Sequence, residues 1–96
     1  MSAYFFFDNL HVFAPEKLDL YRQSVEPVVE KFGGRYRVVG GPTTVCEGIW
    51  RPVYPVIIEF DDVDRAQAWY DSDDYRELKA LRQAAVTCNA VLIGGV

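Results

Sequence analysis

The chain has 96 residues, of which 50% are hydrophobic and 25% charged, and its net charge is −4. This composition is typical of a single globular domain, here residues 1–96, and not of a disordered chain. No cluster of Lys and Arg is present, which argues against nucleic acid or an anionic membrane as a partner. No stretch approaches the roughly 20 apolar residues of a membrane span, and no signal-peptide pattern opens the chain, so we expect a cytoplasmic protein.

The first predicted strand covers residues 3–12 and is apolar on both faces. Phe5 and Phe7 point to one side of such a strand, and Tyr4 and Phe6 point to the other. Its second face therefore needs a cover of its own.

The segment that begins at Pro15 has the pattern of an amphipathic helix. Its apolar side chains recur at spacings of three and four residues, at Leu18, Tyr21, Val25, Val28, Val29 and Phe32. Pro27 lies inside this pattern, so we expect the helix to kink or divide there. Gly33-Gly34 predicts a left-handed cap at its carboxyl end.

Strands are predicted on both sides of a turn-rich middle segment. Residues 35–39 form the second strand, Gly40-Gly41-Pro42 interrupts it, and residues 43–49 resume it. Trp50-Arg51-Pro52 then turns the chain into a third strand over residues 53–60. One face of the third strand carries Tyr54, Val56, Ile58 and Phe60, and the other carries Ile57 and Glu59.

Two helices and a last strand complete the predicted elements. Asp61, Asp62 or Asp64 caps a first helix, and Ser72 caps a second. The first helix carries Ala66, Trp69 and Tyr70, and the stripe of the second consists of Tyr75, Leu78, Leu81 and Ala85. The last strand is predicted over residues 90–93, before Gly94-Gly95.

The predicted order is β-α-β-β-α-β, which indicates an α+β ferredoxin-like fold with a four-stranded antiparallel sheet. Because crossover connections are right-handed, both helical segments fall on one face of the sheet. The other face is apolar from the first and third strands and stays open in a monomer. We therefore expect a homodimer that closes two open sheet faces into a dimeric α/β barrel.

Several motifs in order along the chain resemble one bacterial family. They are Gly33-Gly34-Arg35, Gly40-Gly41, Glu47-Gly48-x-Trp50-Arg51-Pro52, Val56-Ile57-Ile58-Glu59-Phe60, Ala68-Trp69-Tyr70-x-Ser72-x-x-Tyr75 and Leu78-Lys79-Ala80-Leu81-Arg82. Together they resemble the family catalogued as domain of unknown function 1330. That family resembles the dimeric α/β-barrel superfamily, which implies a ferredoxin-like protomer and a homodimer but no particular reaction.

A ligand-binding cleft is expected between the helices and the sheet, where aromatic side chains meet a few polar groups. Its predicted lining is Trp50, Arg51, Trp69, Tyr70, Tyr75 and Arg82. Trp50 and Arg51 would stack on and clamp a carboxylate, or else close the barrel rim, with Arg51 paired to Glu47 or Glu59. Lys79 and Arg82 recur at helical spacing from Tyr75, which would lower the pKa of its phenol; a solvated helix face is the alternative.

Three residues are weak candidates for catalysis: His11, Glu59 and Tyr75. His11 is the only side chain with an ordinary pKa near neutrality, and no second ligand or orienting acid accompanies it. Glu59 needs an arginine partner, Arg35, Arg37 or Arg51, if it is buried, or else lies at the dimer seam.

The remaining polar motifs predict neither a cofactor nor a metal. The acidic residues around 61–64 and 71–74 do not match a calcium loop, and no glycine-rich phosphate loop opens a helix. Cys46 and Cys88 match no metal or redox spacing, so buried or half-buried free thiols are expected. Three functions remain open: a homodimeric small-molecule binding barrel, which we favour; a cofactor-free enzyme of monooxygenase or isomerase type; and a structural or stress-associated dimer without a ligand site.

Overall fold

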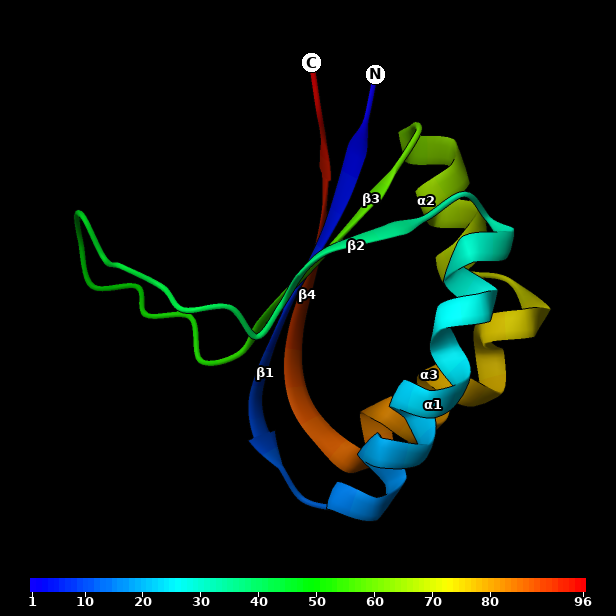
Figure 1. Ribbon diagram of the computed structural model, residues 1–96, viewed down its shortest axis with the longest axis horizontal. Helices are drawn as coiled ribbons and strands as arrows, with labels where there is room; N and C mark the ends of the chain where they lie inside the picture. The colour runs from blue at the N-terminus through cyan, green and yellow to red at the C-terminus, as the bar shows by residue number, and fades with distance from the viewer.

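The computed structural model describes residues 1–96 as a four-stranded antiparallel sheet with three helices (Figure 1). Along the chain the elements are β1 (Ala3–Val12), α1 (Pro15–Lys31), β2 (Arg35–Val39), β3 (Pro55–Phe60), α2 (Val63–Tyr70), α3 (Asp73–Ala85) and β4 (Val86–Gly94). The strand order is β2-β3-β1-β4, and every neighbouring pair is antiparallel. This is the predicted ferredoxin-like α+β fold, and its sheet is open rather than closed. No helix is long and apolar enough to cross a membrane.

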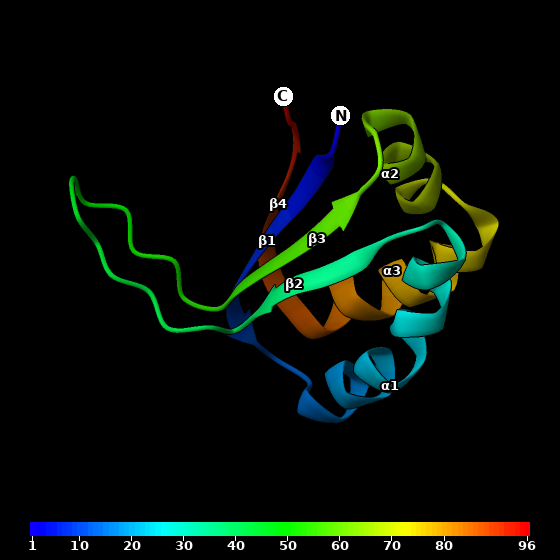
Figure 2. The same cartoon turned by 45° about the horizontal axis from the view of Figure 1, so that its top comes forward.

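All three helices pack against one face of the sheet (Figures 1 and 2). The register puts Phe5 opposite Ile58 on one side and Leu92 on the other, so side chains from three strands meet on the helix face. Phe5, Ile58 and Phe60 of this face pack with Trp69 of α2 in the core. The alternation predicted for the first and third strands is confirmed.

The two predicted helix caps are present. Asp62 accepts a hydrogen bond from the Arg65 backbone N–H at 2.7 Å, and Ser72 accepts one from that of Tyr75 at 3.1 Å. At the end of α1, Gly33 adopts a positive φ of 78°, which glycine tolerates without steric cost. Pro27 does not divide α1, which runs unbroken from Pro15 to Lys31.

The prediction of a strand over residues 43–49 is wrong. Residues 40–54 contain no strand and form a long arm that projects on the side of the sheet away from the helices (Figures 1 and 2). Gly40 turns the chain with a φ of 63°, and its N–H donates to the Pro55 carbonyl at 2.7 Å, which closes the base of the arm. Because β2 is an edge strand, residues 43–49 have no neighbouring strand to pair with.

The last strand is longer than predicted, because it begins at Val86, directly after α3, and not at residue 90. Its extra residues pair with the end of β1, down to Val12 opposite Val86. Pairing with β1, which is distant in the sequence, therefore determines where β4 begins, and the local sequence pattern does not. The third strand, predicted over 53–60, begins at Pro55.

The face of the sheet opposite the helices carries an uncovered apolar row. Phe6 lies opposite Ile57 on one side and Val91 on the other, and Tyr4 lies opposite Ile93. Val91 and Ile93 are half exposed, at 53% and 50%. Such an exposed apolar row, which is bordered by Glu59 opposite Tyr4, is typical of an association surface.

Candidate functional site

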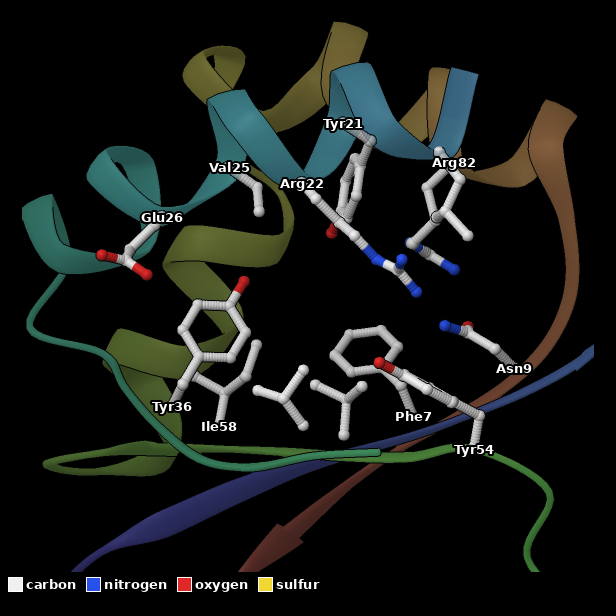
Figure 3. A pocket seen from close by; sticks show the side chains of 13 residues that line it. Phe7, Asn9, Tyr21, Arg22, Val25, Glu26, Tyr36, Tyr54, Ile58 and Arg82 are labelled. Atoms are coloured by element: carbon white, nitrogen blue, oxygen red, sulfur yellow. The ribbon is translucent and has the colours of Figure 1, made fainter. Parts of the chain in front are cut away.

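A cavity of about 230 Å³ lies between α1 and the helix-facing side of the sheet (Figure 3). Most of its wall is apolar or aromatic, made of Phe7, Leu18, Tyr21, Val25, Tyr36, Val39, Tyr54, Val56 and Ile58. Its four polar lining residues are Asn9, Arg22, Glu26 and Arg82. An apolar pocket with a few convergent polar groups is the usual form of a small-molecule site.

Three elements, β1, α1 and α3, bring the polar groups to the cavity. Asn9 alternates with Phe7 on the helix face of β1, and the register shift of β1 against β4 follows it directly. Arg22 and Glu26 are one helical turn apart on α1. In Figure 3 the Asn9 amide and the Arg22 guanidinium gather at one end of the cavity, whereas Glu26 lies at the other end near Tyr36.

Arg82, in the last turn of α3, is a buried cation at the Asn9 end of the cavity. Its side chain is only 5% exposed, and its guanidinium carbon lies 5.1 Å from the centre of the Phe7 ring. Its Nε donates a hydrogen bond to the Tyr75 hydroxyl oxygen at 3.2 Å. None of the ion pairs in the molecule includes Arg82. Burying a guanidinium without a carboxylate partner costs free energy, so Arg82 is a candidate for binding a ligand.

The Tyr75 hydroxyl joins this arginine to a second phenol. Tyr21 and Tyr75 share a hydrogen bond of 2.8 Å between their hydroxyl oxygens. Burial raises the pKa of both phenols above the ordinary value, and the Arg82 charge opposes this only in part. The lowered phenol pKa expected for Tyr75 is therefore wrong, because desolvation outweighs the cation. Lys79, the other expected neighbour, lies 4.2 Å from the centre of the Tyr70 ring instead.

Tyr54, at the end of the arm, forms part of the cavity wall. The Arg22 guanidinium carbon lies 5.4 Å from the centre of the Tyr54 ring. The edge of this ring also lies so close to Gly40 that a Cβ at that position would clash with it. Asp8 accepts hydrogen bonds from the Val53 and Tyr54 backbone N–H groups at 2.9 and 2.8 Å, which fixes Tyr54 to β1.

Of the six residues predicted to line a cleft, Arg82 alone is in the wall of this cavity. Trp69 and Tyr75 are fully buried in the core, and the Trp69 indole nitrogen has no hydrogen-bond partner. Tyr70 is half buried and stacks on Phe5, with ring centres 5.2 Å apart.

The other two predicted residues, Trp50 and Arg51, belong to the arm. Trp50 packs on Phe6 of the uncovered sheet face, with ring centres 5.5 Å apart, and is still 64% exposed. Arg51 is exposed and pairs with neither Glu47 nor Glu59. A separate open hollow lies between the arm and this face, with Phe6, Ile57 and Trp50 in its wall.

The three catalytic candidates do not meet in one place. His11 is exposed near the end of β1, where its ring contacts Phe13 and lines a second, open hollow that adjoins the cavity at Asn9, Arg22 and Tyr54. Glu59 lies on the opposite face of the sheet, away from the cavity. Tyr75 is fully buried behind Tyr21.

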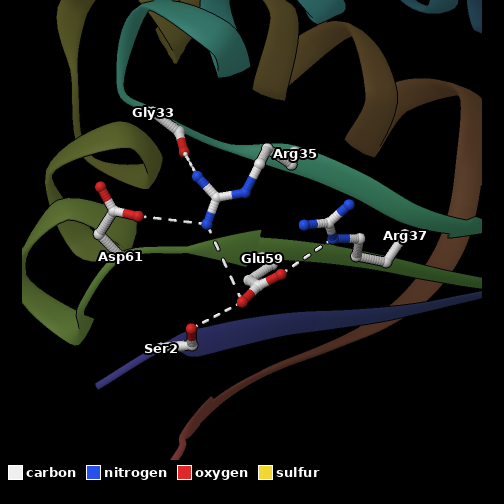
Figure 4. Close-up of polar contacts among 6 residues, drawn as sticks. All are labelled: Ser2, Gly33, Arg35, Arg37, Glu59 and Asp61. Atoms are coloured by element: carbon white, nitrogen blue, oxygen red, sulfur yellow. Dashed lines mark hydrogen bonds and ion pairs between the residues drawn. The ribbon is translucent and has the colours of Figure 1, made fainter.

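Glu59 pairs with two of its three predicted arginine partners, Arg35 and Arg37 (Figure 4). Its carboxylate accepts from Arg37 Nε at 2.9 Å and from the Ser2 hydroxyl at 2.6 Å, and Arg35 Nη2 lies 3.9 Å away. The hydrogen bonds from Ser2 and Arg37 lower the pKa of this carboxyl. Arg35 also binds Asp61 at 3.2 Å.

The two cysteines are both free and differ in exposure. Cys46 is exposed on the arm, contrary to the expected burial, and Cys88 is half buried on β4. Burial raises the pKa of the Cys88 thiol, so it stays protonated near neutral pH.

Sequence reasoning missed most of the cavity wall, notably Asn9, Arg22, Tyr36 and Tyr54. Each of these stands at a position that a strand or helix pattern accounts for without a ligand. One signal was available: Asn9 is a polar residue on the otherwise apolar helix face of the first strand. Its Oδ1 is buried without a hydrogen-bond partner in the structure.

The chain belongs to the family described as Domain of unknown function (DUF1330), which it matches over residues 2–96. No curated protein matches it. Its fold is similar to that of a protein of unknown function from Rhodopseudomonas palustris, with 20% identity, a TM-score of 0.74, and coverage of 99% of this chain and 82% of that one.

Two further solved structures have the same fold. One is a dimeric ferredoxin-like protein of unknown function from Jannaschia sp. CCS1, with 13% identity, a TM-score of 0.71, and coverage of 99% of this chain and 100% of that one. The other is SnoaB, a cofactor-independent oxygenase from Streptomyces nogalater, with 13% identity, a TM-score of 0.63, and coverage of 99% and 92%.

Proposed function

We propose that this member of the DUF1330 family is a homodimeric binding protein that holds a small apolar or acidic metabolite between α1 and the sheet. The observation that carries the proposal is the cavity of about 230 Å³ with its apolar, aromatic wall and its four polar residues, three of which lie at one end. A dimer with a purely structural role needs no such cavity, because core side chains would fill it.

The uncovered sheet face supports the homodimer. Its apolar row includes Phe6, Val91 and Ile93, and the arm extends from the same side of the sheet (Figure 1). The arm exposes Ile49 at 97% and Trp50 at 64%. A second copy facing this surface would bury both features, and the relative from Jannaschia sp. CCS1 is itself described as dimeric.

A cofactor-free enzyme is less well supported. Proton transfer needs a group that can reach a ligand and whose pKa lies near the working pH. His11 and Glu59 lie outside the cavity, and burial holds the Tyr75 phenol in its neutral form. The likeness to SnoaB is a likeness of fold at low identity and assigns no reaction here. The cytoplasmic location stays a prediction from the sequence.

Homodimerisation is tested by light scattering on the full chain. We expect the wild type to have twice the mass of the chain and Val91→Asp to shift it toward the monomer, because a carboxylate would be buried at the seam. Leu20→Asp is the matched control, since Leu20 is equally exposed, at 54%, but lies on α1. A monomeric wild type at micromolar concentration contradicts the proposed assembly.

Occupation of the cavity is tested by an NMR titration with 4-methylacetophenone, a neutral aromatic probe. We expect saturable shifts in backbone amides around the cavity, and their loss in Val39→Trp, whose larger side chain fills it from β2. Leu20→Trp adds the same ring outside the cavity and should leave binding unchanged. Shifts that map elsewhere, or that survive Val39→Trp, contradict the proposed site.

A further inference from the structure

Positive charge without a balancing carboxylate gathers at one end of the cavity. The Arg22 and Arg82 guanidinium groups and the Asn9 amide all point to that end (Figure 3). Neither arginine takes part in an ion pair with any Asp or Glu of the molecule. Glu26, the one acidic residue of the lining, lies at the opposite end. The cavity therefore has a cationic end and an opposite end that is lined by apolar and aromatic side chains and by Glu26.

Arg82 is arranged so that it can bind a further group. Its Nε donates to the Tyr75 hydroxyl oxygen, the Cys88 thiol lies beside the guanidinium, and the Nη groups donate to no oxygen atom of the protein. The Phe7 ring below it and the hydrogen bond to Tyr75 hold the guanidinium in place. A planar guanidinium with free parallel N–H groups matches the two oxygens of a carboxylate.

The Asn9 side chain has hydrogen-bonding capacity left at the same end. Its Nδ2 group carries N–H donors that a carboxylate can accept, whereas its Oδ1 atom, which is buried without a partner, is an acceptor and cannot bind a carboxylate. A ligand head group that reaches Arg82 would also come to lie against this amide.

The rest of the cavity limits the body of the ligand. Its volume of about 230 Å³ is below the roughly 300–1,000 Å³ of pockets that hold drug-sized molecules, so the body must be small. Rings of Phe7, Tyr21 and Tyr36 face it together with aliphatic side chains. Such walls favour a flat apolar body that can stack or pack edge-to-face.

We propose that the cavity selects a small aromatic carboxylate, whose carboxylate group is held by Arg82 and Asn9 and whose ring lies toward Tyr36. This inference rests on the proposed binding function and names the ligand class of that site. Arg82 is a binding residue in this proposal, and Arg22 adds positive charge at the same end of the cavity.

The test compares two probes of similar shape in NMR titrations of the full chain: 4-methylbenzoate, which carries the carboxylate, and 4-methylacetophenone, which does not. We expect the wild type to bind the carboxylate at least about tenfold more tightly, with amide shifts around Phe7, Asn9 and Arg82. Arg82→Met should reduce this preference to about threefold or less and leave the affinity for the ketone nearly unchanged. Arg76→Met is the matched control, because Arg76 lies on the same helix but is exposed and pairs with Asp73.

Equal affinity for the two probes in the wild type overturns the inference while leaving the proposed binding function in place. A preference that survives in folded Arg82→Met, or carboxylate shifts that map to the Arg35 and Arg37 edge, also overturns it. If neither probe binds, both the inference and the proposed function fail. Should Arg82→Met not fold by circular dichroism, the comparison in the wild type and its shift map still decide the matter.

Discussion

The buried chain Tyr21–Tyr75–Arg82 should contribute to stability unequally at its two phenols. The Tyr75 hydroxyl bonds Tyr21 at 2.8 Å and accepts from Arg82 Nε at 3.2 Å, whereas the Tyr21 hydroxyl makes only the bond to Tyr75. Tyr75→Phe therefore leaves two polar groups without their partner, one of them charged. Tyr21→Phe leaves only one, and that group keeps its bond to Arg82.

The expected magnitudes follow from this count. An unpaired buried group costs about 1–3 kcal/mol, but water in the adjoining cavity can reach Tyr21 and Arg82, so the lower part of that range applies. We expect Tyr75→Phe to lower the free energy of unfolding by about 2 kcal/mol and Tyr21→Phe by about 1 kcal/mol. The double variant should lose about 2 kcal/mol rather than the sum, because their shared bond is removed only once.

Urea denaturation at one fixed protein concentration measures these differences, since the stability of a dimer depends on concentration. Tyr70→Phe is the control, because the Tyr70 hydroxyl makes no hydrogen bond in the protein and its removal should change stability by less than about 0.5 kcal/mol. Equal losses for the two single variants, or strict additivity in the double variant, would refute the reasoning about this chain.

Two further predictions concern the core and its phenols. Gly34→Ala should lower the free energy of unfolding by about 1–3 kcal/mol, because a Cβ there would lie 2.5 Å from Val29 Cγ1 and 2.8 Å from Phe60 Cε1. Gly41→Ala, whose Cβ would make only an ordinary 3.6 Å contact, is the control, and equal effects of the two in urea denaturation would contradict the packing argument. Above about pH 10 stability should fall with rising pH, because burial raises the pKa of the Tyr21, Tyr36 and Tyr75 phenols, so the folded state keeps protons that the unfolded state releases. Each phenol adds a slope of up to about 1.4 kcal/mol per pH unit; a flat profile from pH 9 to 11.5 would count against their burial as neutral groups.

Local patterns predicted the parts of the fold that depend on local physics. Alternation along the first strand gave the correct faces for Phe5 and Phe6, because side chains of a strand point to opposite sides with period two. The cap at Ser72 was predictable because one hydroxyl satisfies a nearby backbone N–H. Elements whose limits depend on distant partners were not predictable in this way, and both the arm over residues 40–54 and the long β4 strand belong to this class.

The site was harder to predict for the same reason. Its wall comes from elements far apart in the sequence, so that Asn9 of β1 and Arg82 of α3 meet only after the sheet and helices have packed. Tyr75 does lie beside a cation, as its spacing from Arg82 suggested. Its pKa nevertheless moves up, because a sequence pattern shows the neighbour but not the depth of burial.

The base of the arm connects the uncovered face of the sheet, where we propose the dimer contact, with the cavity on the helix face. Asp8 lies on β1, is buried, and accepts the backbone N–H groups of Val53 and Tyr54. The Tyr54 ring lies close to both Gly40 and the Arg22 guanidinium and forms part of the cavity wall. A second copy that contacts the arm would therefore contact the same segment whose last residue, Tyr54, lines the cavity.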